Sequence, residues 1–95
     1  MKKIHPKYVP GYYGTPEQLA EKLGELRYDI NLKVDRRLVE VYKQQAQDDE
    51  RAGHPQLAKL LRQRVEIMQR AADNMEKIFK LCKDKPGMKD ETRGF

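Results

Sequence analysis

The chain has 95 residues and a net charge of +5, with 37% charged and only 7% aromatic residues. This length allows one small domain, and the composition favours an elongated helical protein over a compact sphere. A single cysteine excludes an intramolecular disulfide, and two distant histidines do not complete a structural zinc site. No stretch approaches the ~20 apolar residues that span a bilayer, so we expect a cytoplasmic protein without membrane contact.

Residues 1–14 contain two prolines, two glycines and three tyrosines, which excludes a regular helix. We expect an extended or disordered tail that mixes basic and aromatic side chains. Tyrosine anchors protein interfaces and stacks on bases, and lysine attracts phosphate. The candidate partner-binding residues of the tail are Lys2, Lys3, Lys7, Tyr8, Tyr12 and Tyr13. The alternative is that the tyrosines cap the open end of the helical domain.

A first helix is predicted over residues 16–52. Thr15 is a good N-cap, Pro16 suits the first helical position, and Gln18 completes a capping box. Apolar residues then recur in steps of three and four, at Leu19, Leu23, Leu26, Ile30, Val34, Leu38 and Val41. A break near residues 30–35, with Asp35 as a second N-cap, is the alternative. We favour a continuous helix.

A second helix is predicted over residues 55–85, after the helix-breaking sequence Ala52-Gly53-His54-Pro55. Its apolar stripe is Leu57, Leu61, Val65, Met68, Ala72, Met75, Phe79 and Cys82. From Leu61 onward the steps alternate between three and four, as in a heptad seam. Lys85-Pro86-Gly87 ends the helix, so residues 15–85 form the domain and residues 86–95 a disordered C-terminal tail.

The two stripes predict the fold. Their members pair at residue numbers that sum to about 106, for example Ile30 with Met75 and Leu38 with Met68. Two antiparallel helices folded back at Gly53 would stack such pairs in layers. We therefore predict an all-α fold, a long antiparallel helical hairpin.

Each predicted helix also carries a second, weaker apolar line, which a lone hairpin leaves uncovered. We expect two hairpins to cover these lines by dimerising into a four-helix bundle. The predicted oligomer interface is Tyr28, Leu32, Val39, Tyr42, Leu60, Ile67, Asn74, Ile78 and Leu81. The alternative cover is the N-terminal tail or a different protein.

No catalytic, metal or nucleotide motif stands out, so we predict neither enzymatic activity nor a cofactor. The leading hypothesis is a small adaptor or regulator that binds a protein partner as a homodimer. The alternative is a nucleic-acid-binding accessory protein that uses the tail and the basic residues of the second helix. Those bases are Lys59, Arg62, Arg70, Lys77 and Lys80, with acidic Glu66 and Asp73 on the same line.

Overall fold

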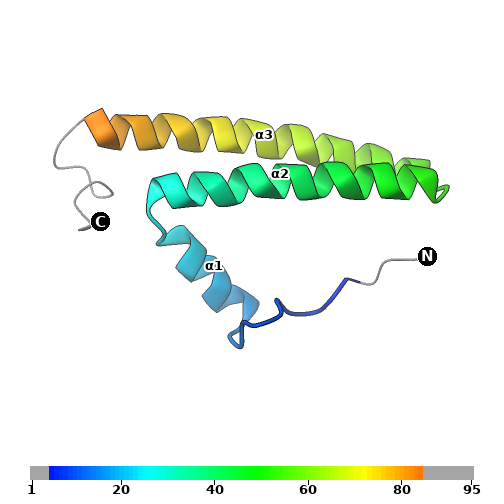
Figure 1. Cartoon of the computed structure of the whole chain (residues 1–95), viewed down its shortest axis with the longest axis horizontal. Helices are drawn as coiled ribbons and strands as arrows, with labels where there is room; N and C mark the ends of the chain where they lie inside the picture. Colours follow the sequence, from blue (N-terminus) through cyan, green and yellow to red (C-terminus); the bar gives the residue numbers. More distant parts are fainter. Residues whose placement is uncertain (1–4, 85–95) are drawn as a thin grey trace.

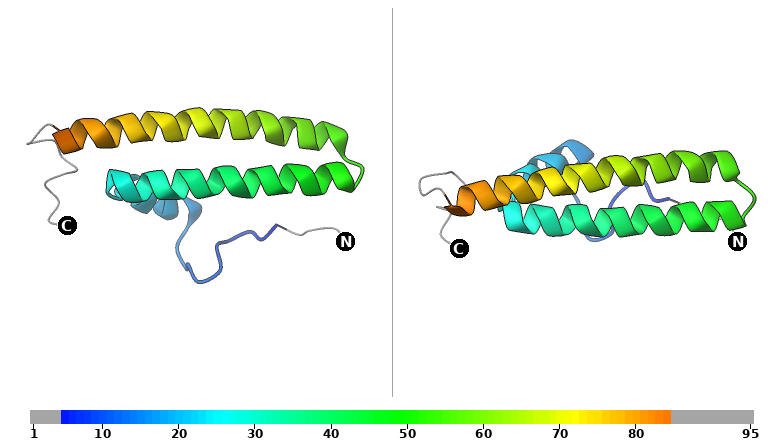
Figure 2. Two further views of the ribbon diagram at one scale, coloured as in Figure 1. Left: turned by 45° about the horizontal axis from the view of Figure 1, so that its top comes forward. Right: turned by 90° about the horizontal axis from the view of Figure 1, so that it is seen from above.

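The computed structural model describes residues 5–84, and these residues form three helices and no strand. Helix α1 spans Pro16–Gly24, α2 spans Tyr28–Arg51 and α3 spans Pro55–Asp84 (Figure 1). The all-α prediction is confirmed for this part of the chain. Lys2, Lys3 and the predicted C-terminal tail lie outside the described residues. Helices α2 and α3 run side by side in opposite directions and form the main contact of the fold (Figures 1 and 2).

Helix α1 begins as the sequence predicts. The Thr15 side chain accepts a hydrogen bond from the Gln18 backbone N–H at 3.1 Å, and Gln18 Oε1 accepts from the Thr15 N–H at 2.9 Å. This reciprocal pair is a complete capping box, with Pro16 at the first helical position. The chain therefore enters α1 from residues 5–14, which contain neither helix nor strand.

The prediction of one continuous helix over residues 16–52 is wrong, because the chain leaves helical geometry between Gly24 and Tyr28. Arg27 is extended, with ψ 142°, and its guanidinium holds the Asp29 carboxylate at 2.8 Å. Asp29 Oδ1 also accepts from the Ile30 N–H at 3.0 Å, which satisfies one of the open donors at the start of α2. Glycine has poor helix propensity and the aspartate supplies a local alternative to the helical bond, so the break falls here and not at residues 30–35.

The turn between α2 and α3 matches its sequence. Gly53 has φ +86°, a left-handed conformation that residues with a Cβ rarely adopt. The Ala52 N–H donates to the Asp48 carbonyl and the His54 N–H to the Asp49 carbonyl, which satisfies the last carbonyls of α2. Pro55 then starts α3, where its missing N–H costs nothing.

The core lies in two rows that face each other across the α2–α3 contact. We call these rows the seam. In α3 the buried and half-buried members are Ala58, Leu61, Val65, Met68, Ala72, Met75, Phe79 and Cys82. In α2 they are Tyr28, Leu32, Asp35, Val39, Tyr42, Ala46 and Asp49. Both rows step alternately by three and four, so the two helices pack as an antiparallel heptad pair.

The seam of α3 agrees with its predicted stripe, but α2 turns a different side toward its neighbour than we expected. Val39 is only 4% exposed and Ala46 is buried, whereas the predicted stripe residues Val34 and Leu38 are half-buried and Val41 is exposed. The buried alanines explain the preference, because small side chains let two helix backbones approach closely. Val34, Leu38 and Val41 of α2 consequently lie outside the seam.

Helix α1 diverges from the α2–α3 pair and is joined to it near the start of α2 (Figure 2). The Asn31 side-chain amide donates to the Leu23 carbonyl at 3.0 Å, across the break between the helices. This bond satisfies a carbonyl at the open C-terminal end of α1. Leu19 of α1 and Leu26 in the break after it are half-buried, so this segment keeps one apolar side partly covered.

Candidate interaction surface

Ion pairs define one outer face of the α2–α3 pair. Arg36 contacts Asp73 at 3.0 Å and Glu76 at 2.8 Å, and Arg62 pairs with Glu50. Each of these five residues comes one position after a seam residue in the sequence. The residues one position after the seam residues therefore lie together on one side of the α2–α3 pair. We call this side the charged face. Its pairs are exposed, so they orient the helices more than they stabilise them.

The charges on this face also act on one another. Hydrogen bonds from Lys80, at 3.2 Å, and from Arg36 stabilise the Glu76 carboxylate and lower its pKa, and the positive charges of both residues add to this effect. Asp73 and Glu76 in turn raise the pKa of Arg36. The charged face is therefore well hydrated, and an apolar partner would not bind there favourably.

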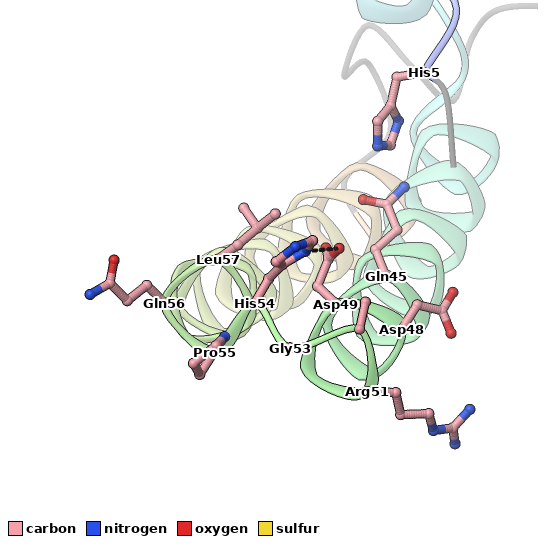
Figure 3. Close-up of a pocket in the computed structure, with 11 residues that line it drawn as sticks. His5, Gln45, Asp48, Asp49, Arg51, Gly53, His54, Pro55, Gln56 and Leu57 are labelled. Carbon is pink, nitrogen blue, oxygen red and sulfur yellow. Dashed lines mark ion pairs between the residues drawn. The ribbon is translucent and has the colours of Figure 1, made fainter. Parts of the chain in front are cut away.

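The residues one position before each seam residue lie on the opposite side. Neighbouring residues of a helix are about 100° apart, so the residues before and after a seam residue point to opposite flanks of the seam. In α3 these residues are Leu57, Leu60, Arg64, Ile67, Ala71, Asn74, Ile78 and Leu81. In α2 they are Asn31, Val34, Leu38, Val41, Gln45 and the charged Asp48. We call this side the apolar face. Figure 3, a close-up at the turn, shows Gln45 of α2 and Leu57 of α3 extending to the same side.

Large aliphatic side chains on the apolar face are exposed. Leu57 is 47% exposed, Leu60 61%, Ile67 52% and Leu81 45%. Such side chains usually lie inside a protein, and a row of them along one helix marks a candidate contact surface, interrupted here by the exposed Arg64 and Asn74. The exposed group lies on α3, whereas Leu38 of α2 is half-buried on the side where Asn31 joins α1.

The structure separates the residues of the predicted oligomer interface. Leu60, Ile67, Asn74, Ile78 and Leu81 all lie on the apolar face of α3. The four residues from the first predicted helix lie instead in the seam of one chain; they are Tyr28, Leu32, Val39 and Tyr42. The apolar face has Val34, Leu38 and Val41 on α2, which sequence reasoning assigned to the inside of the hairpin. Periodicity marked both rows of α2 but ranked the row that is buried against α3 as the weaker one.

Two tyrosines of the N-terminal segment are exposed to solvent, and the third is half-buried. Tyr13 is 98% exposed, and Tyr8 and Lys7 are also exposed. Tyr12 is half-buried, its hydroxyl lies over Gly14, and that hydroxyl has no hydrogen-bond partner. Tyr12 is consequently placed to anchor the segment near the start of α1, while Tyr8 and Tyr13 face solvent.

An open hollow lies at the turn, lined in part by His5, Gln45, Asp49 and His54 (Figure 3). His54 Nδ1, in the turn, lies 3.9 Å from Oδ1 of Asp49 in the last turn of α2, which is a long contact. Among the described residues, no serine, threonine or cysteine lines the hollow, so the histidines have no nucleophile there to activate. Across residues 5–84, no cluster of three histidine, cysteine or acidic side chains is arranged to hold a metal ion.

No helix within the described residues combines the length and apolar composition needed to cross a membrane. Comparison of the chain with protein-family models, curated proteins and solved structures finds no match in any of the three. The proposed function is therefore based on the surface geometry of the chain.

Proposed function

We propose that this chain is a non-enzymatic protein–protein interaction module that works as a homodimer. Two hairpins, each made of α2 and α3, meet through their apolar faces as a four-helix bundle. The observation that supports this most is the exposed aliphatic group on α3, formed by Leu57, Leu60, Ile67 and Leu81. It extends over 25 residues of one helix, about 36 Å, which matches the length of a helix–helix interface better than a small-molecule site.

The second contribution to binding comes from the N-terminal segment. Tyr8 and Tyr13 are exposed next to Lys7, and aromatic side chains beside a positive charge suit an interface with an acidic protein surface. This segment borders the apolar face at the turn, where His5 lines the same hollow as Gln45 and Leu57. The adaptor role requires that Tyr8 and Tyr13 stay exposed beside the dimer contact and bind a different protein there.

Nucleic-acid binding receives less support. Of the basic residues on α3, Arg62 is paired with Glu50 and Lys80 with Glu76, so part of the positive charge is neutralised within the chain. A phosphate-tracking surface needs basic residues that are free to replace counterions. If this role were correct, binding to single-stranded or duplex nucleic acid would weaken steeply with added salt.

The test is molar mass by light scattering over a wide range of protein concentration, with two substitutions on α3. Ile67→Glu places a charge on the apolar face, and Gln69→Glu places the same charge on the charged face, two residues away. We expect wild type and Gln69→Glu to be dimers and Ile67→Glu to be a monomer with unchanged helical circular dichroism. A wild-type monomer at every concentration, or a dimeric Ile67→Glu, would contradict the proposal.

A further inference from the structure

The exposed row of α3 on the apolar face has a symmetry of its own. Its members step alternately by three and four, in the order Leu57, Leu60, Arg64, Ile67, Ala71, Asn74, Ile78, Leu81. Read from either end, the row gives two aliphatic residues, one polar residue and one aliphatic residue. The centre of the row is at the level of residue 69. A surface that reads the same in both directions can pair with a second copy of itself around a twofold axis.

We propose that the dimer forms by antiparallel pairing of α3 with α3 of a second copy, in the register where facing residue numbers sum to 138. This inference rests on the proposed homodimer and specifies its interface. In this register Leu57 faces Leu81 of the second copy and Leu60 faces Ile78 of the second copy. Every aliphatic member of the row meets an aliphatic member, as a heptad interface requires.

The two polar members also meet each other in this register. Arg64 faces Asn74 of the second copy, and the pair occurs twice because of the twofold symmetry. A guanidinium has only donors, and the Asn74 side-chain oxygen is an acceptor, so the two are matched. The Arg64 guanidinium already lies 5.8 Å from the centre of the Tyr42 ring in the same chain, which holds it near the α2–α3 contact.

Other registers and directions break this match. A shift by seven residues places Arg64 opposite Ile67 or Leu81 of the second copy, so a charge is buried against an aliphatic side chain. A parallel arrangement places Arg64 opposite Arg64, which is repulsive. Pairing of α3 with α2 of the second copy would bring it to the side of α2 where Asn31 holds α1. The polar pair therefore selects one antiparallel register, a role that single polar residues have in coiled coils.

Charge substitutions at Asn74 test the register, because Asn74 and Arg64 are both exposed in the single chain and their replacement leaves the seam intact. Asn74→Lys places a like charge opposite Arg64, and we expect the dissociation constant of the dimer to rise by at least about tenfold. Asn74→Asp places an opposite charge there and tightens the dimer. Combining Asn74→Lys with Arg64→Glu should restore most of the affinity. Gln69→Lys on the charged face is the matched control and should change little.

Disulfide trapping gives an independent measure of direction. In a Cys82→Ala background, one chain carries Leu57→Cys and a second, differently tagged chain carries Leu81→Cys. We expect a disulfide that joins the two different chains, because residues 57 and 81 face each other in the register of 138. Disulfides between two Leu57→Cys chains would indicate a parallel dimer and overturn the inference.

The outcomes separate the two proposals. A wild-type chain that is monomeric at all concentrations removes the homodimer and the register together. A wild-type dimer whose dissociation constant is the same in Asn74→Lys, Asn74→Asp and Gln69→Lys leaves the homodimer in place and overturns only the register. Weakening by Asn74→Lys with restoration by Arg64→Glu supports both.

Discussion

Asp35 is a polar residue in the apolar seam, and replacing it with leucine should stabilise the fold. The carboxyl is half-buried in the row of α2 that faces α3, and this burial raises its pKa. A leucine that is partly buried at this position should gain about 1 kcal/mol, and its better helix propensity adds about 0.5 kcal/mol. For a domain of this size the sum corresponds to a rise in Tm of roughly 6–12 °C.

The pH dependence of folding stability distinguishes the effect of the Asp35 charge from the effect of its side-chain shape. Folding raises the pKa of Asp35, so the folded chain binds the proton more tightly than the unfolded chain. The contribution of Asp35 to stability is therefore greatest at acidic pH and is lost as the pH rises through the folded-state pKa. Asp35→Asn has nearly the same shape but no charge, so it should be more stable than wild type at neutral pH. This difference should shrink at acidic pH.

The assay is thermal unfolding followed by circular dichroism at one fixed protein concentration, because the proposed dimerisation would link Tm to concentration. Wild type, Asp35→Asn and Asp35→Leu are compared at neutral and acidic pH, so that the titration of all other acids cancels in the differences. An unchanged or lower Tm for Asp35→Leu, with native helical content, would refute the assignment of Asp35 to the seam. A difference between Asp35→Asn and wild type that is independent of pH would refute its charge penalty.

Three further substitutions test local features. Gly53→Ala forces a Cβ into a left-handed turn with φ +86°, so it should cost about 1 kcal/mol and lower Tm by roughly 4–8 °C in thermal unfolding. Gly14→Ala places a Cβ 2.6 Å from Cζ of Tyr12 and 2.8 Å from Oε1 of Gln18, so the ring and the capping side chain must both move; we expect shifted Tyr12 signals in NMR spectra and faster amide hydrogen exchange at the start of α1. Thr15→Ala removes the acceptor for the Gln18 N–H, which weakens the start of α1 by about 1 kcal/mol. It should speed amide hydrogen exchange in α1 but not in α3.

The sequence predicted the ends of elements where one residue type satisfies a specific backbone requirement. Thr15 and Gln18 cap α1, and Gly53 adopts the left-handed conformation before Pro55 starts α3. These are local interactions between residues within a few positions of one another, so the pattern and the geometry correspond closely. The break after Gly24 was missed because each of its causes is weak alone. It needs the glycine, the bond from Arg27 to Asp29 and the bond from Asn31 back to Leu23 together.

The seam of α2 could not be predicted from hydrophobicity alone. One row has only aliphatic residues, Ile30, Val34, Leu38 and Val41. The seam row mixes Leu32, Val39 and Ala46 with two tyrosines and the polar Asp35 and Asp49. An uninterrupted run of aliphatic side chains favours the first row, whereas close packing of small buried residues such as Ala46 and Ala58 favours the second. Periodicity gives the angle between rows on one helix, and only the neighbouring helix decides which row is buried. The candidate interface shifted for the same reason.

The distribution of charge and apolar surface limits how far this chain can assemble. Ion pairs of Arg36 and Arg62 occupy one side of the α2–α3 pair, and the exposed aliphatic residues occupy the other. A twofold interface uses the same surface on both copies, so in the proposed dimer the α2–α3 pair has no second apolar face for a third chain. A head-to-tail contact would instead leave one surface open and add further copies. The one apolar face of the α2–α3 pair therefore favours a closed dimer over a filament in this proposal, and other surfaces remain for a different partner.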